Sequence, residues 1–174
     1  EGEQSGSGNL SDHAAVGLGL LDAYEATGEV AFLLTSLRIS TILQEDFTDT
    51  EKGGFFDTTG DDPLLPNRGQ DFQDGAVPSG TALALQLLAR LSPLDDSEKT
   101  AGTVQAAIDR LAPLAGRAPQ AFPSLLIATD AWLGPMLEIV LDGTPGEEAF
   151  ETMLSRARTQ LVPARLLIPS ANEA

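Results

Sequence analysis

Residues 68–81 bring together the side chains of this chain that are best suited to chemistry. The stretch carries Arg68, Asp71, Asp74 and Ser79, and it lies between a segment rich in turn-forming residues and a run of small apolar residues typical of a helix. Two carboxylates are the groups that glycosyl chemistry uses as acid, base or nucleophile. Asp71 and Asp74, together with Arg68, could therefore form a sugar-binding or acid–base cluster.

A structural interpretation of the same stretch competes with the catalytic one, and we favour it. In this interpretation Arg68 bridges to a carboxylate, and Asp74 or Ser79 caps the helix that follows by accepting hydrogen bonds from its free N–H groups. Ser79 has little support as a hydrolytic nucleophile, because no G-x-S-x-G turn surrounds it. The sequence thus leaves the catalytic residues, if there are any, unassigned.

A second candidate site is the adjacent pair Asp12 and His13. An imidazole beside a carboxylate can act as a general base near neutral pH. The pair also stands at the predicted start of a helix, where the helix dipole favours an acidic residue and leaves the histidine exposed. We favour this structural interpretation, and the candidates for ligand binding are then Asp12, His13, Arg68, Asp71, Asp74 and Ser79.

The composition excludes several classes of function. The 174 residues include no cysteine and one histidine, which excludes disulfides, thiolate metal sites, thiol redox chemistry and multi-histidine metal sites. We expect neither a metal nor a cofactor. The 26 acidic and 10 basic residues give a net charge of −16, which makes nucleic acid and anionic lipid poor partners. The longest apolar run is too short for a membrane span, and a reducing compartment, cytoplasmic or stromal, is favoured.

Apolar residues recur at helical spacing along most of the chain, which predicts a mainly α fold built from antiparallel helical hairpins. Gly17 and Gly19 are expected where a neighbouring helix approaches closely. The tail changes period and predicts a strand, a helix that begins with Thr144 as cap and Pro145 in the first turn, and a second strand. The predicted helices are 10–27, 30 to 44–47, 78 or 79 to 91, 96 or 97 to 113, 119 or 123 to 133, and 145–161, and the strands are 136–141 and 164–168.

The chain is predicted to have three parts around one well-buried core. Residues 1–8 contain nothing to bury and are expected to form a disordered lead-in. Residues 9–134 form the body of helical hairpins. Residues 135–174 form a strand–helix–strand extension and a tail.

Several motifs, in this order along the chain, resemble one known family. They are residues 12–14 and 19–28, then 53–57, then 68–80, and finally 125–143. Together they resemble the C-terminal helical region of thioredoxin-domain-containing proteins of the spermatogenesis-associated protein 20 type, over roughly residues 9 to 168. The resemblance implies part of an (α/α)6 toroid similar to that of N-acylglucosamine 2-epimerase, with polar loops gathered at one mouth.

The chain departs from that family in ways that bear on function. The family's thioredoxin-like part is missing, and only about half of a six-hairpin ring fits into 174 residues. Thr81 stands where the family usually carries Asn, and His13 is the single histidine where the related epimerases use two. These departures favour a module without catalytic activity.

Two functions from different classes follow. The first is a non-catalytic interaction or structural module, because half a ring leaves apolar helix faces that a protein partner or a second copy would cover to complete the ring. The second is a carbohydrate-active enzyme fragment or subunit, epimerase-, isomerase- or hydrolase-like, that binds a sugar-like small molecule at the loop mouth. In the second, Asp12, Arg68, Asp71 and Asp74 surround the ligand.

Overall fold

The chain is mainly helical, with a small strand–helix–strand unit after the last helix of the body, as predicted. The computed structural model describes residues 8–60, 68–95, 97–162 and 164–171, so the predicted lead-in lies, apart from Gly8, outside the described residues. The elements are α1 Leu10–Thr27, α2 Val30–Ile42, the π-helical turn Leu43–Phe47, α3 Gly80–Leu91, α4 Glu98–Arg117, the 3-10 turn Pro119–Ala121, α5 Pro123–Leu133, β1 Leu137–Gly143, α6 Glu148–Thr159 and β2 Arg165–Ala171.

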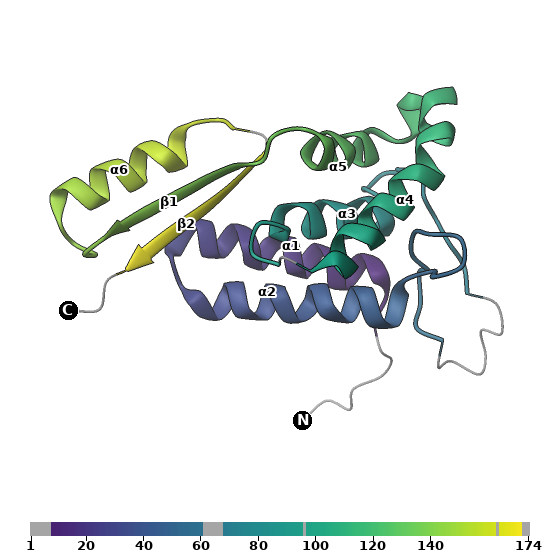
Figure 1. The fold of residues 1–174 in the computed structure, drawn as a ribbon, viewed down its shortest axis with the longest axis horizontal. Coiled ribbons are helices and arrows are strands. Elements are labelled where there is room, and N and C mark those ends of the chain that lie inside the picture. The colour runs from purple at the N-terminus through teal and green to yellow at the C-terminus, as the bar shows by residue number, and fades with distance from the viewer. Residues whose placement is uncertain (1–7, 61–67, 96, 163, 172–174) are drawn as a thin grey trace.

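The helices of the body lie side by side in the order α2, α1, α3, α5 (Figure 1). α1 and α2 form a hairpin around Gly28, whose φ of 77° and bond from its N–H to Tyr24 O at 2.7 Å end α1 in a left-handed cap. The described residues between α2 and α3, 48–60 and 68–79, lie at one end of these helices, and the strands lie toward the other end (Figure 1). The main core is formed by Leu10, Leu21, Leu43, Phe47, Phe55, Leu85, Leu87, Leu88, Leu91, Val104, Leu111, Leu125 and Leu166, among others.

The two glycines of α1 behave differently. A Cβ added at Gly17 would lie 2.4 Å from Leu87 Cδ2 and 3.0 Å from Ile39 Cγ2, and Gly17 O accepts a buried hydrogen bond from Ser36 Oγ at 2.9 Å. The predicted close approach is therefore confirmed at Gly17. It is wrong at Gly19, which is exposed and has no atom within 4 Å of an added Cβ.

The predicted end of the fourth helix is wrong. α4 does not stop near Pro113 but continues to Arg117, with the proline inside it. Leu111 and Ala115 lie on either side of the proline in sequence and are both buried. Because the apolar face continues across the proline, packing offsets the loss of one backbone hydrogen bond. The start of α4 is as predicted at Ser97, whose side chain accepts a bond from Thr100 N, whereas the alternative cap Asp96 lies outside the described residues.

The predicted start of the last helix is also wrong. Thr144 does not cap α6; instead Glu147 N donates to Thr144 O at 3.1 Å in a turn, and α6 begins at Glu148. The reason is Gly146, whose φ of 89° lies in the left-handed region and interrupts a right-handed helix. At its other end α6 stops at Thr159, and Leu161 is exposed.

β1 and β2 are parallel, with Leu137 opposite Arg165 and Val140 opposite Ile168. Their connection through α6 makes the predicted crossover unit, each strand being displaced by one or a few residues from its predicted range. On one face of the sheet, Leu167 packs with Ile139, Leu141, Phe150 and Leu154 beneath α6. On the other face, Leu166 belongs to the main core. β2 therefore attaches the unit to the helical body.

Candidate functional site: a polar pocket at the loop end of the helices

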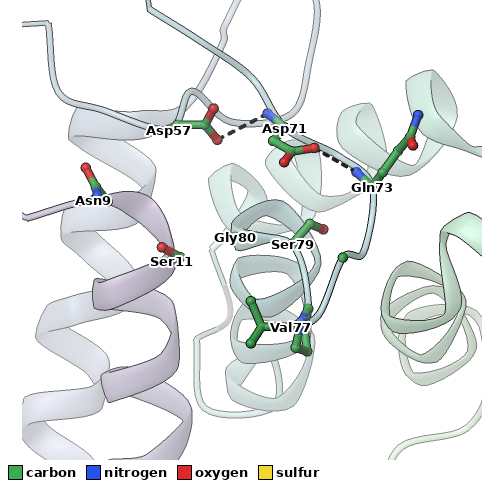
Figure 2. Close-up of a pocket in the computed structure, with 10 residues that line it drawn as sticks. Asn9, Ser11, Asp57, Asp71, Gln73, Val77, Ser79 and Gly80 are labelled. Carbon is green, nitrogen blue, oxygen red and sulfur yellow. Dashed lines mark hydrogen bonds between the residues drawn. The ribbon is translucent and has the colours of Figure 1, made fainter.

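A pocket of about 330 Å³ lies where the N-terminal ends of α1 and α3 meet the loop that precedes α3 (Figure 2). α1 approaches α3 closely here, because a Cβ added at Gly80 would lie 3.1 Å from Ser11 N. The free N–H groups of two helix starts are thus directed toward this end of the molecule. The pocket is lined by Asn9, Ser11, Asp57, Asp71, Gln73, Gly75, Val77, Pro78, Ser79 and Gly80.

Two carboxylates stand on one side of the pocket. Asp57 Oδ1 accepts a hydrogen bond from Asp71 N at 3.2 Å, and Asp71 Oδ1 accepts one from Gln73 N at 3.1 Å (Figure 2). The backbone of Asp57 also holds the loop to α1, because Asp57 O accepts from Leu10 N at 2.9 Å. Asp71 is exposed, so its second carboxylate oxygen can meet a ligand.

Asp74 and Ser79 accept hydrogen bonds from backbone N–H groups at the starts of α3 and α5. Asp74 Oδ1 accepts from Ser79 N at 2.8 Å, and its Oδ2 accepts from Ser124 N, in the first turn of α5, at 2.7 Å. Ser79 Oγ caps α3 by accepting from Ala82 N at 3.3 Å. Burial raises the pKa of the Asp74 carboxyl, but the hydrogen bonds from Ser124 and Ser79 outweigh it, so this pKa lies below its ordinary value. The structure therefore confirms Ser79 as the cap of α3, whereas Asp74, the alternative, binds the N–H of the cap residue Ser79 and an N–H of α5.

Arg68 lies apart from the other predicted site residues. Its guanidinium stacks over the ring of Phe56, with Cζ 4.2 Å from the ring centroid. Arg68 Nε donates to Thr58 O at 2.7 Å, and Nη2 donates to Asp46 O. Among the described residues no ion pair joins Arg68 to a carboxylate, so the predicted bridge is wrong within that part of the chain. The guanidinium of Arg68 donates its hydrogen bonds to main-chain carbonyls instead.

Asp12 and His13 are engaged at the start of α1. Asp12 Oδ2 accepts from Asn9 N at 3.1 Å, the return bond of a capping box. His13 Nδ1 lies 2.9 Å from Asn9 O, so this nitrogen carries the proton and donates to the carbonyl. The imidazole packs on Phe47 at a centroid distance of 5.3 Å. Of the six candidates, Asp71 and Ser79 line the pocket, while Asp12, His13, Arg68 and Asp74 lie outside its lining.

Sequence reasoning missed a polar cluster that fixes the loop on α4. Gln70 Nε2 donates to Asp49 Oδ2 at 3.0 Å, and Arg110 Nη2 donates to Gln70 Oε1 at 2.9 Å. Arg110 also donates to Gly53 O and stacks on Phe72 at 4.9 Å. Burial raises the pKa of Asp49, but bonds from the N–H groups of Lys52 and Glu51, from Gln70 and the nearby Arg110 together lower it below the ordinary value. Asp49, Gln70 and Arg110 are 21 to 61 positions apart, too far for a sequence motif.

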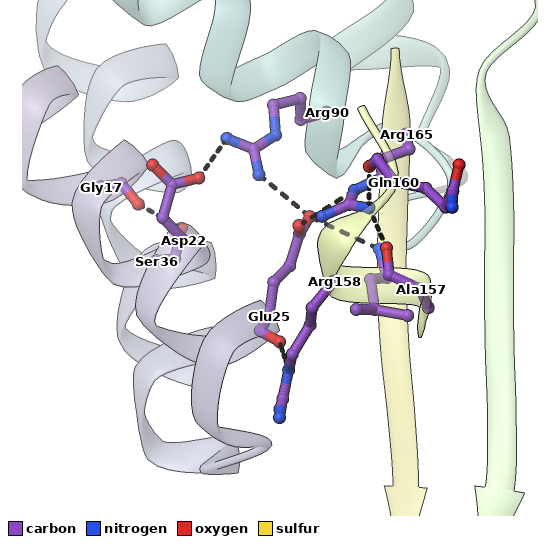
Figure 3. Close-up of polar contacts among 10 residues, drawn as sticks. Gly17, Asp22, Glu25, Ser36, Arg90, Ala157, Arg158, Gln160 and Arg165 are labelled. Atoms are coloured by element: carbon purple, nitrogen blue, oxygen red, sulfur yellow. Dashed lines mark hydrogen bonds and ion pairs between the residues drawn. The ribbon is translucent and has the colours of Figure 1, made fainter. Parts of the chain in front are cut away.

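A second missed cluster centres on Glu25, which joins the helical body to the strand unit (Figure 3). Glu25 is only 7% exposed, and its Oε1 lies 2.9 Å from Arg90 Nη2 and accepts from Leu167 N at 3.4 Å. Arg165 Nε lies 3.8 Å from Oε2, and Arg158 Nε donates to Glu25 O at 3.0 Å. Glu25 lies within a motif of the resemblance, but its spacing in a helix gives no sign of burial.

The described residues define the general chemistry that the chain can support. No three His, Asp or Glu side chains of the described ranges come together in a way that could hold a metal ion. None of the helices in those ranges is long and apolar enough to cross a membrane. The pocket at the loop end of the helices therefore offers hydroxyl, amide and carboxylate groups to a ligand, with helix N–H groups nearby.

These features describe a mainly helical protein whose hairpins carry a polar pocket at their loop end. Over 166 residues, 92% of this chain, it is 32% identical to spermatogenesis-associated protein 20 of Rattus norvegicus. The corresponding proteins of Mus musculus and Homo sapiens are each 31% identical over the same share of the chain. The chain is homologous to this part of spermatogenesis-associated protein 20, as its motifs predicted. It spans about a fifth of the length of these relatives, 20% of the rat protein. No family model matches the chain.

Proposed function

We propose that this chain is a non-catalytic interaction module, a set of helical hairpins that forms part of an (α/α) toroid together with further helices. The observation that carries the proposal is the exposure of apolar side chains on α2 and α5, the two helices at the ends of the array. On α2, Leu34 is 52% exposed and lies one turn after the exposed Val30. On α5, Ile127 is 60% exposed, beside Leu126 and before Leu133, both exposed.

Both end helices carry apolar side chains on their exposed faces as well as on their buried ones. The inner helices α1 and α3 are each covered on both sides by neighbours, whereas α2 and α5 each have a neighbour on one side of the array. Apolar faces of this kind are normally covered by another protein surface. A protein partner or a second copy that supplies further hairpins would bury both faces and complete the ring. Under this proposal residues 9–134 act as the partial toroid and residues 135–174 as its extension.

The proposal is tested by charge substitution on the two end faces. Leu34→Asp on α2 and Ile127→Asp on α5 are expected to reduce the association of the chain, measured as weight-average molar mass by light scattering. Val16→Asp is the matched control, because Val16 is 56% exposed on α1, an inner helix of the array. The free energy of unfolding of each variant should lie within about 0.5 kcal/mol of that of the parent, as is usual for exposed substitutions. Equal molar masses for all four proteins would contradict assembly with a second copy through these faces.

The second candidate function is binding of a sugar-like ligand in the pocket at the loop end of the helices, and the groups that line the pocket favour it. The pocket offers hydrogen-bond donors and acceptors of the kind that the hydroxyls of a sugar ring need. They are Ser11, Gln73 and the carboxylates of Asp57 and Asp71. The probe is N-acetylglucosamine, followed by chemical-shift changes at the Asp71 and Gln73 amides. Asp71→Asn should abolish these changes without lowering the melting temperature. If Asp71→Asn unfolds earlier, or no shift occurs in the parent, this candidate fails.

A further inference from the structure

The rest of the molecule covers the outer edge of β2 in the small sheet, whereas residues of β1 remain exposed. Among the described residues the sheet contains β1 and β2 alone. The outer edge of β2 is covered: Leu167 N donates to the buried carboxylate of Glu25 at 3.4 Å, and both Leu166 and Leu167 are buried. Two strands with one open edge make a marginal sheet. A further strand beside β1 would complete the sheet.

The outer edge of β1 presents backbone groups and apolar side chains together. Leu137 N donates to Ala164 O at 2.9 Å, so Leu137 directs its backbone groups toward β2. Because consecutive residues of a strand direct these groups to opposite sides, Glu138 and Val140 direct theirs away from β2. Val140 is 59% exposed and Leu137 is 48% exposed, and Glu138 is exposed between them. An exposed edge of this kind is a template for strand addition.

We propose that the outer edge of β1 binds an extended peptide segment of a partner protein as a third, antiparallel strand, with an apolar residue opposite Val140 and a basic residue opposite Glu138. The backbone of the segment exchanges hydrogen bonds with Val140. The pair that Glu138 forms with the basic residue makes the edge prefer a positively charged segment. This surface is separate from the α2 and α5 faces, so the inference does not depend on the proposed function.

Charge selects a basic segment over a second copy of this chain. Glu138, Val140 and Asp142 share one face of β1, because they alternate along the strand. If two copies of β1 paired antiparallel about Val140, Glu138 of each copy would lie opposite Asp142 of the other. Like charges directly opposite one another destabilise a strand pair, whereas opposite charges stabilise it. The net charge of −16 adds to the repulsion between copies and to the attraction for a basic segment.

The test uses the full chain and the synthetic peptide Thr-Lys-Val-Val-Val-Lys-Thr, whose central Val would lie opposite Val140 and whose Lys residues would lie on the face of Glu138. Titration calorimetry should detect binding, and hydrogen exchange of the Glu138 and Val140 amides should slow on binding. The Ile139 amide, which faces β2, should not change. Replacing both Lys by Glu should weaken binding about tenfold or more, since two attractive pairs become repulsive.

Two matched pairs of controls separate strand addition from other modes of binding. N-methylation of the central Val removes the bond to Val140 O and should abolish binding, whereas N-methylation of the next Val, whose N–H points away from β1, should not. Glu138→Lys should weaken binding of the Lys peptide, whereas Glu45→Lys, an exposed charge reversal outside the sheet, should leave it unchanged.

Each remaining outcome overturns the inference. Absence of binding, equal binding of the Glu peptide, or insensitivity to both N-methyl groups would exclude strand addition by a basic segment. A dimer of the chain in which the Glu138 and Val140 amides are protected without peptide would assign the edge to a second copy instead.

Discussion

The Asp74 carboxylate accepts a hydrogen bond from the backbone N–H of Ser124 at 2.7 Å, although the two residues are 50 positions apart. The other oxygen of the same carboxylate accepts from Ser79 N at 2.8 Å. One side chain of the loop thus satisfies donors at the starts of both α3 and α5. This arrangement fixes the pocket at the loop end of the helices, because the loop that carries Asp71 ends on these two helices.

Asp74→Ala is therefore expected to destabilise the fold. Each lost helix-start bond costs about 1 kcal/mol, so the free energy of unfolding should fall by about 2 kcal/mol. For a chain of this size that corresponds to a melting temperature lower by about 4–8 °C, measured by circular dichroism. Asp71→Ala is the matched control and should lower it by less than half as much, because Asp71 is exposed and holds one local turn. Equal effects would contradict the bridging role.

The free energy of unfolding should depend on acid pH through Asp74. Its pKa is lowered in the folded state, against burial, by the bonds from Ser124 and Ser79. A lowered folded-state pKa gives stability that is complete above the unfolded value of about 3.9 and is lost as pH falls toward and through the folded value. Melting temperatures from pH 6 down to pH 2 should therefore fall more steeply for the parent than for Asp74→Asn. Parallel curves would show that the carboxylate has the same pKa folded and unfolded.

Glu25→Gln should loosen the strand unit from the helical body. The substitution leaves Arg90 and Arg165 without their shared buried carboxylate, and breaking a buried pair typically costs about 3–5 kcal/mol. Hydrogen exchange at Leu167 should accelerate, because its N–H loses a charged acceptor. Asp22→Asn is the matched control: Asp22 also pairs with Arg90, but its side chain is 64% exposed, and the cost should stay below about 1 kcal/mol. Similar losses of unfolding free energy in the two variants would show that Glu25 is not the residue that holds the strand unit on the helical body.

The two glycines of α1 should respond to alanine with opposite signs. Gly17→Ala places a Cβ against Leu87 and Ile39 and should cost about 1–3 kcal/mol through overpacking. Gly19→Ala meets no atom and should stabilise α1 by about 0.5–1 kcal/mol. Both changes are measured by chemical denaturation. A loss of stability at Gly19, or none at Gly17, would contradict the packing of α1 against α2 and α3.

The sequence predicted those features that depend on local spacing. Apolar periodicity located the helices. Capping needs a polar side chain within a few residues of a helix start, so the cap of α3 was narrowed to Asp74 or Ser79, and it is Ser79. Prediction failed where distant packing decides the outcome. Pro113 stays inside α4 because Leu111 and Ala115 are buried by other elements. At residues 144–147 a match to the capping pattern was overridden by the backbone of Gly146.

The residues of the two polar clusters could not be found from the sequence for the same reason. Glu25 looks like a solvated acid on a helix, and it is buried by distant partners, Arg90 65 residues later and Leu167 142 residues later. The pocket at the loop end of the helices combines Asn9, Asp57 and Asp71 from three segments, so the stretch 68–81 supplied only part of its lining. Arg68 was expected among carboxylates because of its spacing, but the carbonyls of Thr58 and Asp46 are what the fold brings to it.

The intact mass of the native particle that contains this chain tests the proposed interaction module most directly. Native mass spectrometry of that particle should give a mass above the 18.2 kDa of the 174 residues, with further helical hairpins of another chain or a second copy in the particle. A particle of 18.2 kDa alone, with the apolar faces of α2 and α5 left in water, would contradict the account.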